Sequence, residues 1–206
     1  MQGKFIVVEG LEGAGKSSVI SLIVDLLKSK DIDVITTREP GGTPMAESIR
    51  ACVKHNWDET VTEQTELLLM YAARSQLVAN VILPALAKGT WVIGDRHDLS
   101  TVAYQGGGRG IALSTLQQLK TITLGTFVPD FCLYLDVSPE TGLSRARGRG
   151  ELDRIELAGI EFFRRVRTMY ISQIEDMPNA ATIDAEQTMQ QVHADTITAI
   201  MQWVEA

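Results

Sequence analysis

The sequence has little cysteine, a deficit of basic residues and no long apolar run, and each shortage excludes a class of protein. Its two cysteines, Cys52 and Cys132, are expected to be reduced and buried, as in a reducing compartment. Lys and Arg number 19 against 26 Asp and Glu, and the net charge of −7 argues against a surface that coats nucleic acid or anionic lipid. Any bound anion must therefore meet local positive charge.

Membrane-spanning and secretory patterns are also missing. No stretch approaches the roughly 18 uninterrupted apolar residues of a membrane span, and the opening MQGKFIVVEG is unlike a signal peptide. We therefore expect a cytoplasmic protein with no membrane partner. The three histidines, His55, His97 and His193, show no spacing with other metal ligands, so no zinc site is predicted.

Repeats, low-complexity tracts and linkers are absent too, and 206 residues with 45% hydrophobic content are enough for one core. We expect residues 1–206 to form a single domain. Short apolar runs alternate with segments of helical periodicity. Strands are predicted at 4–9, 33–37, 91–94, 131–137 and 181–183, and helices at 17–28, from 44, at 62–87, from 139, from 160 and at 188–204.

The apolar character of these strands predicts an α/β fold of three layers, in which a five-stranded parallel sheet is flanked by helices on both faces. Pro44 suits a first helical turn, and Pro84 is expected to bend or break the end of the long helix. The polar segments EGLEGAGKS, TREPGG and GDRHD each follow a predicted strand. Because ligands bind beyond the carboxyl ends of such strands, we expect the three loops to meet at one cleft.

The first of these loops matches G-x-x-x-x-G-K-[ST] between a strand and a helix, which predicts a P-loop NTPase. The alternative is a glycine-rich turn that arose by chance. Backbone N–H groups of such a loop cradle phosphates, Lys16 spans the β- and γ-phosphates, and the Ser17 hydroxyl ligates Mg²⁺. The predicted nucleotide contacts are Gly10, Leu11, Glu12, Gly13, Ala14, Gly15, Lys16 and Ser17.

An acid follows the third predicted strand. Asp95 is expected to hold the metal ion or its water shell, and its alternative is a helix N-cap. Arg38 and Arg96 also follow strands, and two guanidinium groups there are suited to gripping a monophosphate. Alternatively, Arg38 pairs with Glu39 or Asp95. A nucleotide-dependent switch needs no such grip, and the N-K-x-D stretch of guanine-binding switches does not occur.

The segment RARGRGELDR, residues 145–154, contains four arginines and two glycines and is predicted to be a short mobile lid. Phosphoryl transfer needs positive charge at the migrating group, and closure of a lid excludes water. The alternative is an exposed basic helix end paired with Glu151 and Asp153.

Together, GLEGAGKSS, TREPGGT, the YAAR of 71–74, GDRHDLSTVAYQG and RARGRGELDR resemble bacterial thymidylate kinases. The resemblance covers nearly the whole chain. It implies a homodimeric nucleoside monophosphate kinase fold that uses Mg²⁺ to transfer the γ-phosphoryl of ATP to dTMP, giving dTDP and ADP for dTTP biosynthesis. Two other hypotheses remain: a kinase for another nucleoside monophosphate or a nucleoside, and a switch or binding module that hydrolyses ATP slowly.

The resemblance also implies the contacts of dTMP. Glu12 would accept a hydrogen bond from the 3′-hydroxyl of the deoxyribose, which explains an acid in a phosphate-binding loop. Arg38 and Arg96 would hold the acceptor phosphate.

The base would be addressed by Arg74, while Thr101 and Gln105 would hydrogen-bond its edge. Tyr104 would pack against the sugar and crowd out a 2′-hydroxyl. Thymidylate kinases commonly have phenylalanine four residues before Arg74, and Met70 stands there in this chain, so weaker or altered base packing is expected.

The family divides by the place of its catalytic cation, and Gly13 occupies the loop position at which one branch has arginine. The chain therefore resembles the branch that catalyses from the lid. Arg149 is the first candidate for that cation, beside Lys16 and Arg96. Arg145 is expected on the adenine side of ATP, and Arg147 and Arg154 are further candidates.

Overall fold

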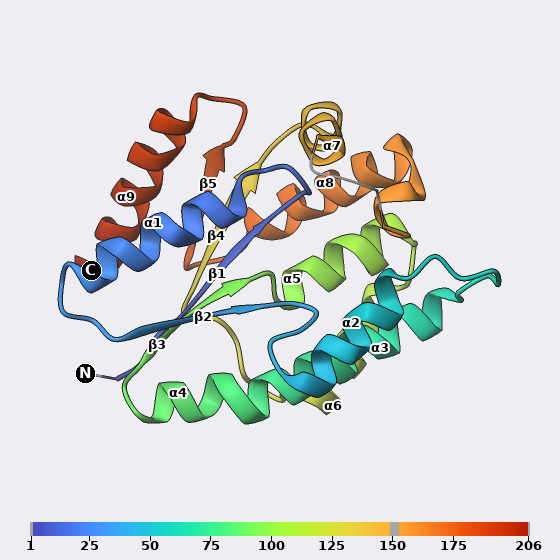
Figure 1. Cartoon of the computed structure of the whole chain (residues 1–206), viewed down its shortest axis with the longest axis horizontal. Coiled ribbons are helices and arrows are strands. Elements are labelled where there is room, and N and C mark those ends of the chain that lie inside the picture. The colour runs from blue at the N-terminus through green and yellow to red at the C-terminus, as the bar shows by residue number, and fades with distance from the viewer. Residues whose placement is uncertain (1, 149–152, 206) are drawn as a thin grey trace.

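The computed structural model describes residues 2–148 and 153–205, and its centre is a five-stranded parallel sheet in the order β2-β3-β1-β4-β5 (Figure 1). This confirms the predicted sheet. The strands are β1 (Phe5–Gly10), β2 (Val34–Arg38), β3 (Trp91–Asp95), β4 (Phe131–Asp136) and β5 (Ala180–Asp184).

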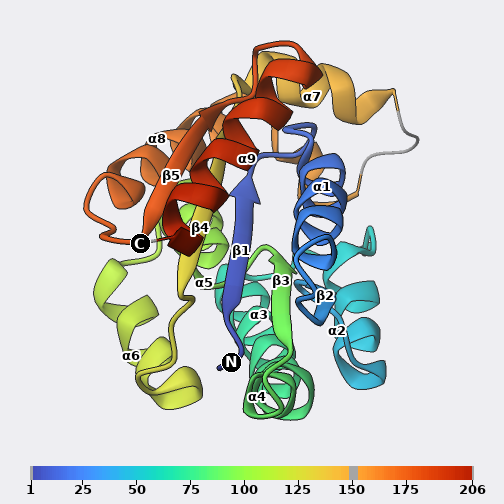
Figure 2. The ribbon, with the colours of Figure 1, turned by 90° about the vertical axis from the view of Figure 1, so that its left-hand side faces the viewer.

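The central strands are apolar because both of their faces are covered. Every residue of β1 is buried, as are all of β4 except its last residue, whereas the edge strands β2 and β5 are mostly half-buried or exposed. Figure 2 shows α1 and α9 side by side on one face of the sheet, with α3 and α4 on the other. Burial on both faces is the reason that these strands lack an apolar and polar alternation.

The helices and short helical segments follow the predicted order, with additions. The segment from Asp98 to Leu124, for which no element is predicted from the sequence, forms α5, η2 and α6. The full set is α1 (Lys16–Lys28), α2 (Pro44–Lys54), α3 (Glu63–Leu77), η1 (Val78–Ile82), α4 (Leu83–Ala87), α5 (Asp98–Thr101), η2 (Val102–Gly108), α6 (Leu113–Leu124), α7 (Pro139–Arg147), η3 (Glu156–Ala158), α8 (Ile160–Ile174) and α9 (Met189–Glu205).

The long helix predicted over residues 62–87 is interrupted near Pro84, as expected. It divides into α3, the π-helical η1 and α4, with Pro84 in the first turn of α4, where its missing N–H is tolerated. By length and composition alone, the 25-residue stretch Glu63–Ala87 could cross a membrane. Its inward face instead joins the protein core through Tyr71, Leu77 and Ile82, which are at most 2% exposed.

The two cysteines differ from the prediction. Cys132 on β4 is buried, but Cys52 is exposed on α2, and both are free thiols. Cys52 lies on the outer side of an amphipathic helix whose buried positions are Ala46 and Val53. The expectation of two interior cysteines was therefore wrong for Cys52.

Candidate functional site

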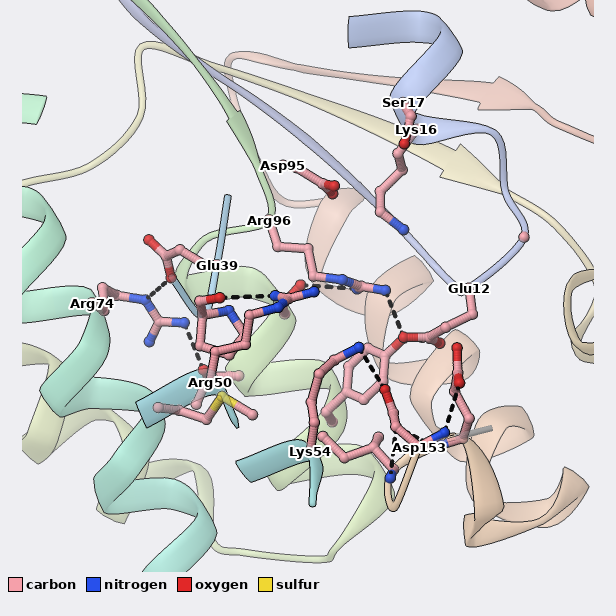
Figure 3. Close-up of a pocket in the computed structure, with 18 of the residues that line it drawn as sticks. Glu12, Lys16, Ser17, Glu39, Arg50, Lys54, Arg74, Asp95, Arg96 and Asp153 are labelled. Atoms are coloured by element: carbon pink, nitrogen blue, oxygen red, sulfur yellow. Dashed lines mark hydrogen bonds and ion pairs between the residues drawn. The ribbon is translucent and has the colours of Figure 1, made fainter. Parts of the chain in front are cut away.

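A pocket of about 280 Å³ opens at the carboxyl ends of β1, β2 and β3 (Figure 3). Its lining includes Glu12 and Lys16 from the loop after β1, Glu39 from the loop after β2, and Asp95 and Arg96 at the end of β3. The three polar loops therefore meet at one cleft, as their positions after the predicted strands indicated.

The loop from Gly10 to Ser17 folds around its own lysine. Lys16 Nζ donates hydrogen bonds to the carbonyl oxygens of Gly10 at 3.1 Å and Leu11 at 3.0 Å. Burial, with a further contribution from the charge of Arg96, lowers the pKa of Lys16 to about 8. The ammonium is thus held inside the loop, where a bound anion would favour its charged form.

Gly13 packs tightly against α7. Its φ of 75° lies in the left-handed region, and a Cβ atom built at this position would overlap the carbonyl oxygen of Gly142. A side chain at position 13 is therefore excluded twice, by backbone conformation and by contact.

The last helix, α9, also contacts this loop and the start of α1. Ser18 Oγ lies 2.8 Å from Nε2 of His193 on α9. Met189 at the start of α9 approaches Gly15, with its Cε 3.9 Å from the position of a Cβ at that glycine. The helix α9 thus forms a wall beside the loop.

Asp95 has an oxygen atom without a partner. Its Oδ1 is buried and makes no hydrogen bond within the part of the chain that the structure describes. The alternative role of Asp95 as a helix N-cap is not seen, because α5 is preceded by His97. Ser17 stands exposed in the first turn of α1, on the same side of the pocket (Figure 3).

These oxygen donors fit Mg²⁺. No group of three or more His, Cys, Asp or Glu side chains gathers among the residues described, but Mg²⁺ in kinases is held by one or two protein groups together with waters and substrate phosphates. An unpartnered carboxylate oxygen and a nearby hydroxyl meet that requirement.

Arg96 stands at the centre of the pocket in an unusual backbone conformation, with φ of 73°. Its guanidinium donates to Glu12 Oε1 at 2.8 Å, to Tyr104 Oη at 3.1 Å and to the hydroxyls of Ser100 and Tyr170 at 3.2 Å. The buried Glu9 accepts the next backbone N–H, that of His97, at 2.8 Å. A non-glycine residue at positive φ has a strained backbone, and such strain is common at functional sites, where the position of the side chain is fixed by its surroundings.

Glu12 is fixed by two donors. Its Oε1 pairs with Arg96, and its Oε2 accepts a hydrogen bond from Tyr104 Oη at 2.6 Å. Burial alone would raise the pKa of Glu12, but the charges of Arg96 and Lys16 outweigh it and the pKa is lowered. Glu12 is therefore a carboxylate at neutral pH.

The far end of the pocket is lined from α3 and η2. Arg74 is 2% exposed; its Nε donates to Glu39 Oε2 at 2.6 Å and its Nη2 to Thr101 Oγ1 at 2.8 Å. Gln105 and Met70 line the same wall. All of the residues predicted to read a base are thus brought together.

Comparisons with known proteins decide the family. The family model described as thymidylate kinase matches residues 8–196. The thymidylate kinase of Alteromonas mediterranea is 62% identical over 204 residues, which cover 99% of this chain and 92% of the relative. That of Idiomarina loihiensis is 56% identical over 99% of this chain and all (100%) of the relative, and that of Pseudoalteromonas translucida 57% identical over 95% and 94%.

The chain belongs to the thymidylate kinase family. The predicted resemblance, the P-loop α/β fold and the enzyme class are confirmed, and with them phosphorylation of dTMP by ATP for dTTP synthesis. These matches argue against the two rival hypotheses, a nucleotide-dependent switch and a kinase for another substrate.

Several predicted site residues do not line the pocket: Gly10, Leu11, Ala14, Arg38 and Arg145. Arg38 is exposed and pairs with Glu47, Nη2 to Oε2 at 2.9 Å, rather than with Glu39 or Asp95. Its place in the lining is taken by Arg50, whose Nη1 donates to the Pro40 carbonyl at 2.8 Å. Sequence reasoning missed Arg50. The available signal was a pair of basic residues four apart on α2, Arg50 and Lys54, which therefore share one helix face.

The lid is described only at its two ends. Arg145 donates to the Ala185 carbonyl at 3.0 Å, near the start of α9, and Arg147 is exposed at the end of α7. Arg149, the first candidate for the catalytic cation, and Glu151 lie outside the described residues. Arg154 is committed elsewhere, since its Nε donates to the Val53 carbonyl at 3.0 Å.

Two acids, one at the end of the lid and one just after it, also escaped prediction as pocket residues. Asp153 and Glu156 line the pocket, and Asp153 pairs with Lys54 at 2.6 Å. Asp153 had been considered only as a partner for the basic residues of the lid.

Proposed function

We propose that ATP occupies the phosphate-loop side of the pocket and dTMP the side formed by α3, α5 and η2, with the two phosphate ends meeting between Lys16 and Arg96. The observation that carries this proposal is that both sites lie in one continuous pocket. One pocket is lined both by the phosphate loop and by Arg74, Thr101 and Gln105. Holding donor and acceptor in one cavity is the main requirement of phosphoryl transfer.

On the donor side, backbone N–H groups of Gly10 to Ser17 bind the phosphates and Lys16 neutralises the transferring group. Asp95 and Ser17 hold Mg²⁺ or its water shell, and the ion supplies charge neutralisation at the phosphates when bound. Arg145 lies beside the nucleoside end of ATP; its contact with the β5–α9 connection supports this assignment.

On the acceptor side, Arg96 holds the phosphate of dTMP, and Arg50 joins it. Both guanidinium groups line the pocket, whereas the predicted contribution of Arg38 needs its pair with Glu47 to open. Glu12 accepts a hydrogen bond from the 3′-hydroxyl of the sugar. Tyr104, which donates a hydrogen bond to Glu12, packs against the sugar ring.

Arg149 supplies the catalytic cation from the lid. The packing of Gly13 supports catalysis from the lid, because an arginine cannot stand at position 13 without a shift of α7. Replacement of Arg149 by Met is expected to lower kcat at least a thousand-fold with little change in the Kd of dTMP. Arg147→Met is the matched control, since it removes a neighbouring arginine.

We also propose a homodimer. Large apolar side chains are exposed on α2, α3 and α6, which pack together, and on α4, which continues from α3 through η1: Met45, Leu68, Leu83, Leu113 and Ile122. A second copy of the chain would cover them. Sedimentation at micromolar concentration is expected to give twice the 22.6 kDa of the chain; a single-chain mass would overturn the dimer. A single domain and a cytoplasmic location stay predictions, consistent with one sheet and two free thiols.

The deciding experiment is a coupled assay of ADP release with ATP and Mg²⁺, in which dTMP, dUMP, UMP, CMP, AMP and GMP are compared as acceptors. Strong turnover with dTMP and near silence with ribonucleotides is expected. Preference for another acceptor would remove the assigned roles of Glu12, Thr101 and Gln105. ADP release without any acceptor would argue against a built acceptor site.

A further inference from the structure

Glu66 is a buried acid on α3 with no role in the reaction described so far. It is 1% exposed, yet it receives several donors. Arg109 donates from Nε to Oε1 at 3.1 Å and from Nη2 to Oε2 at 3.0 Å, Arg154 Nη2 lies 2.8 Å from Oε2, and Gln105 Nε2 donates to Oε1 at 2.7 Å. The last of these contacts reaches the pocket, because Gln105 lines it.

Glu66 is ionised at neutral pH. Burial would raise the pKa of its carboxyl group, but hydrogen bonds from Arg109 and Gln105 and the charges of Arg109 and Arg154 outweigh burial and lower it. A carboxylate can only accept hydrogen bonds. The group of Gln105 that faces Glu66 must therefore be its NH₂, which fixes the orientation of an amide that is otherwise ambiguous.

The other end of that amide is available. Among the described residues, no hydrogen bond reaches Gln105 Oε1, although the side chain as a whole is only 1% exposed. Gln105 thus presents an acceptor to the pocket.

Thr101, four residues earlier, shows the opposite polarity. Its Oγ1 accepts a hydrogen bond from Arg74 Nη2 at 2.8 Å. Its hydroxyl proton finds no acceptor in the part of the chain that the structure describes, so it is free to donate. Thr101 and Gln105 both line the pocket, and together they form one donor and one acceptor.

We infer that Glu66 is a positioning residue that sets the hydrogen-bond polarity of the base site through Gln105, and so selects pyrimidines whose edge carries O4 and N3–H over cytosine. Thymine and uracil offer a donor at N3 and an acceptor at O4, which complement Gln105 Oε1 and the Thr101 hydroxyl. Cytosine offers an acceptor at N3, and this meets Gln105 Oε1, which is also an acceptor, so the contact that thymine and uracil make there is lost. The inference rests on the proposed function, in which dTMP lies against this wall.

The cost of a mismatch explains why such a device is effective. A buried polar group that is left unpaired is costly, so a site built to hydrogen-bond one base edge rejects the other. If the amide of Gln105 were able to turn over, the same pocket would accept either edge. The ionised Glu66 prevents this turn.

Comparison of dUMP with dCMP isolates this polarity, because both lack the methyl group of thymine and share the sugar and phosphate. The test measures kcat/KM of the full-length enzyme for dTMP, dUMP and dCMP in wild type and in Glu66→Gln. A glutamine at 66 can both donate and accept, so it releases the constraint on Gln105 with little change in size. We expect the ratio of dUMP to dCMP to fall about ten-fold in the variant.

The control is Arg109→Gln, which removes an ion pair from Glu66 but leaves its carboxylate on Gln105. This variant is expected to lose thermal stability while it keeps the dUMP to dCMP ratio. An unchanged ratio in Glu66→Gln, or an equal fall in both variants, would overturn the inference. If wild type itself fails to phosphorylate dTMP, the proposed function fails instead, so the two failures are distinguishable.

Discussion

The carboxylate of Glu12 and the guanidinium of Arg96 form an ion pair of 2.8 Å that joins the phosphate loop to the end of β3. The side chains are 18% and 14% exposed, so the pair lies at the pocket surface, where a substrate can reach it. A ligand that brings a hydroxyl and a phosphate to these two groups would find one acceptor and one cation already aligned.

Glu12→Gln tests the assigned contact with the 3′-hydroxyl of dTMP. Wild type is expected to prefer dTMP to its 3′-deoxy analogue by about ten-fold or more in kcat/KM, the usual value of a hydrogen bond to a charged group. The variant should lose most of that preference, because a neutral amide is a weaker acceptor. Equal loss of activity toward both substrates would mean that Glu12 acts only by holding Arg96.

Buried and exposed ion pairs of this chain are expected to differ in their effect on stability. Arg74 and Glu39 are 2% and 5% exposed, whereas Arg38 and Glu47 are 57% and 37% exposed. Arg74→Met leaves Glu39 buried with only His97 as a partner and should lower the free energy of unfolding by about 3–5 kcal/mol. Arg38→Met should change it by at most about 1 kcal/mol. Urea unfolding measures both, and similar losses would contradict the burial argument.

Lys16 should make ATP binding dependent on pH. Its pKa of about 8 in the nucleotide-free enzyme means that the ammonium is lost as pH rises from 7 to 9, whereas a bound triphosphate favours the charged form. Affinity for a non-hydrolysable ATP analogue should therefore fall about ten-fold over this range. Calorimetry in two buffers should show uptake of a proton near pH 8.5 in wild type and none in Lys16→Met.

The same shift has the opposite sign for stability. The folded pKa of Lys16 lies below the ordinary value of 10.5, so between about 8 and 10.5 the unfolded chain binds more protons than the folded one. This lysine therefore adds to the free energy of unfolding as pH rises through that window. The free energy of unfolding of wild type, measured relative to that of Lys16→Met, is therefore expected to rise between about pH 8 and 10.5.

Met70→Phe tests the base wall. Met70 lies in the pocket, half-buried, on the same helix as Arg74. A phenylalanine would stack on thymine, and an aromatic pair is worth about 0.5–1.5 kcal/mol, so KM for dTMP should fall by a few-fold with kcat unchanged. Met70→Leu is the control for side-chain bulk without an aromatic ring. No difference between the two variants would show that position 70 does not contact the base.

The sequence predicted well the features that depend on local patterns. The apolar run of β1 and the spacing from Gly10 to Ser17 predicted the strand, the loop and the helix that follows it, because each is set by contiguous residues. Pro84 also lies where the long helix is interrupted, in the first turn of α4.

Features that depend on distant partners were out of reach. Arg38 ends β2 and Arg50 lies on α2. Arg50 lines the pocket, whereas Arg38 is bound outside it by the carboxylate of Glu47. The orientation of Gln105 is set by Glu66, 39 positions away in sequence. The helix α6 was missed although Leu116 and Leu124 are buried, since its remaining positions mix polar and apolar residues without a clear stripe.

The contact between Gly13 and Gly142 constrains how this enzyme can evolve. A Cβ atom at Gly13 would overlap the carbonyl oxygen of Gly142, and a Cβ atom at Gly142 would overlap the carbonyl oxygen of Glu12, so neither glycine can acquire a side chain while the facing backbone stays in place. If the catalytic cation comes from the lid as proposed, moving that arginine to position 13 would require a displacement of α7 before or together with the substitution. A single substitution at position 13 would place a side chain against the backbone of Gly142, so a loop arginine requires a backbone change as well as one mutation.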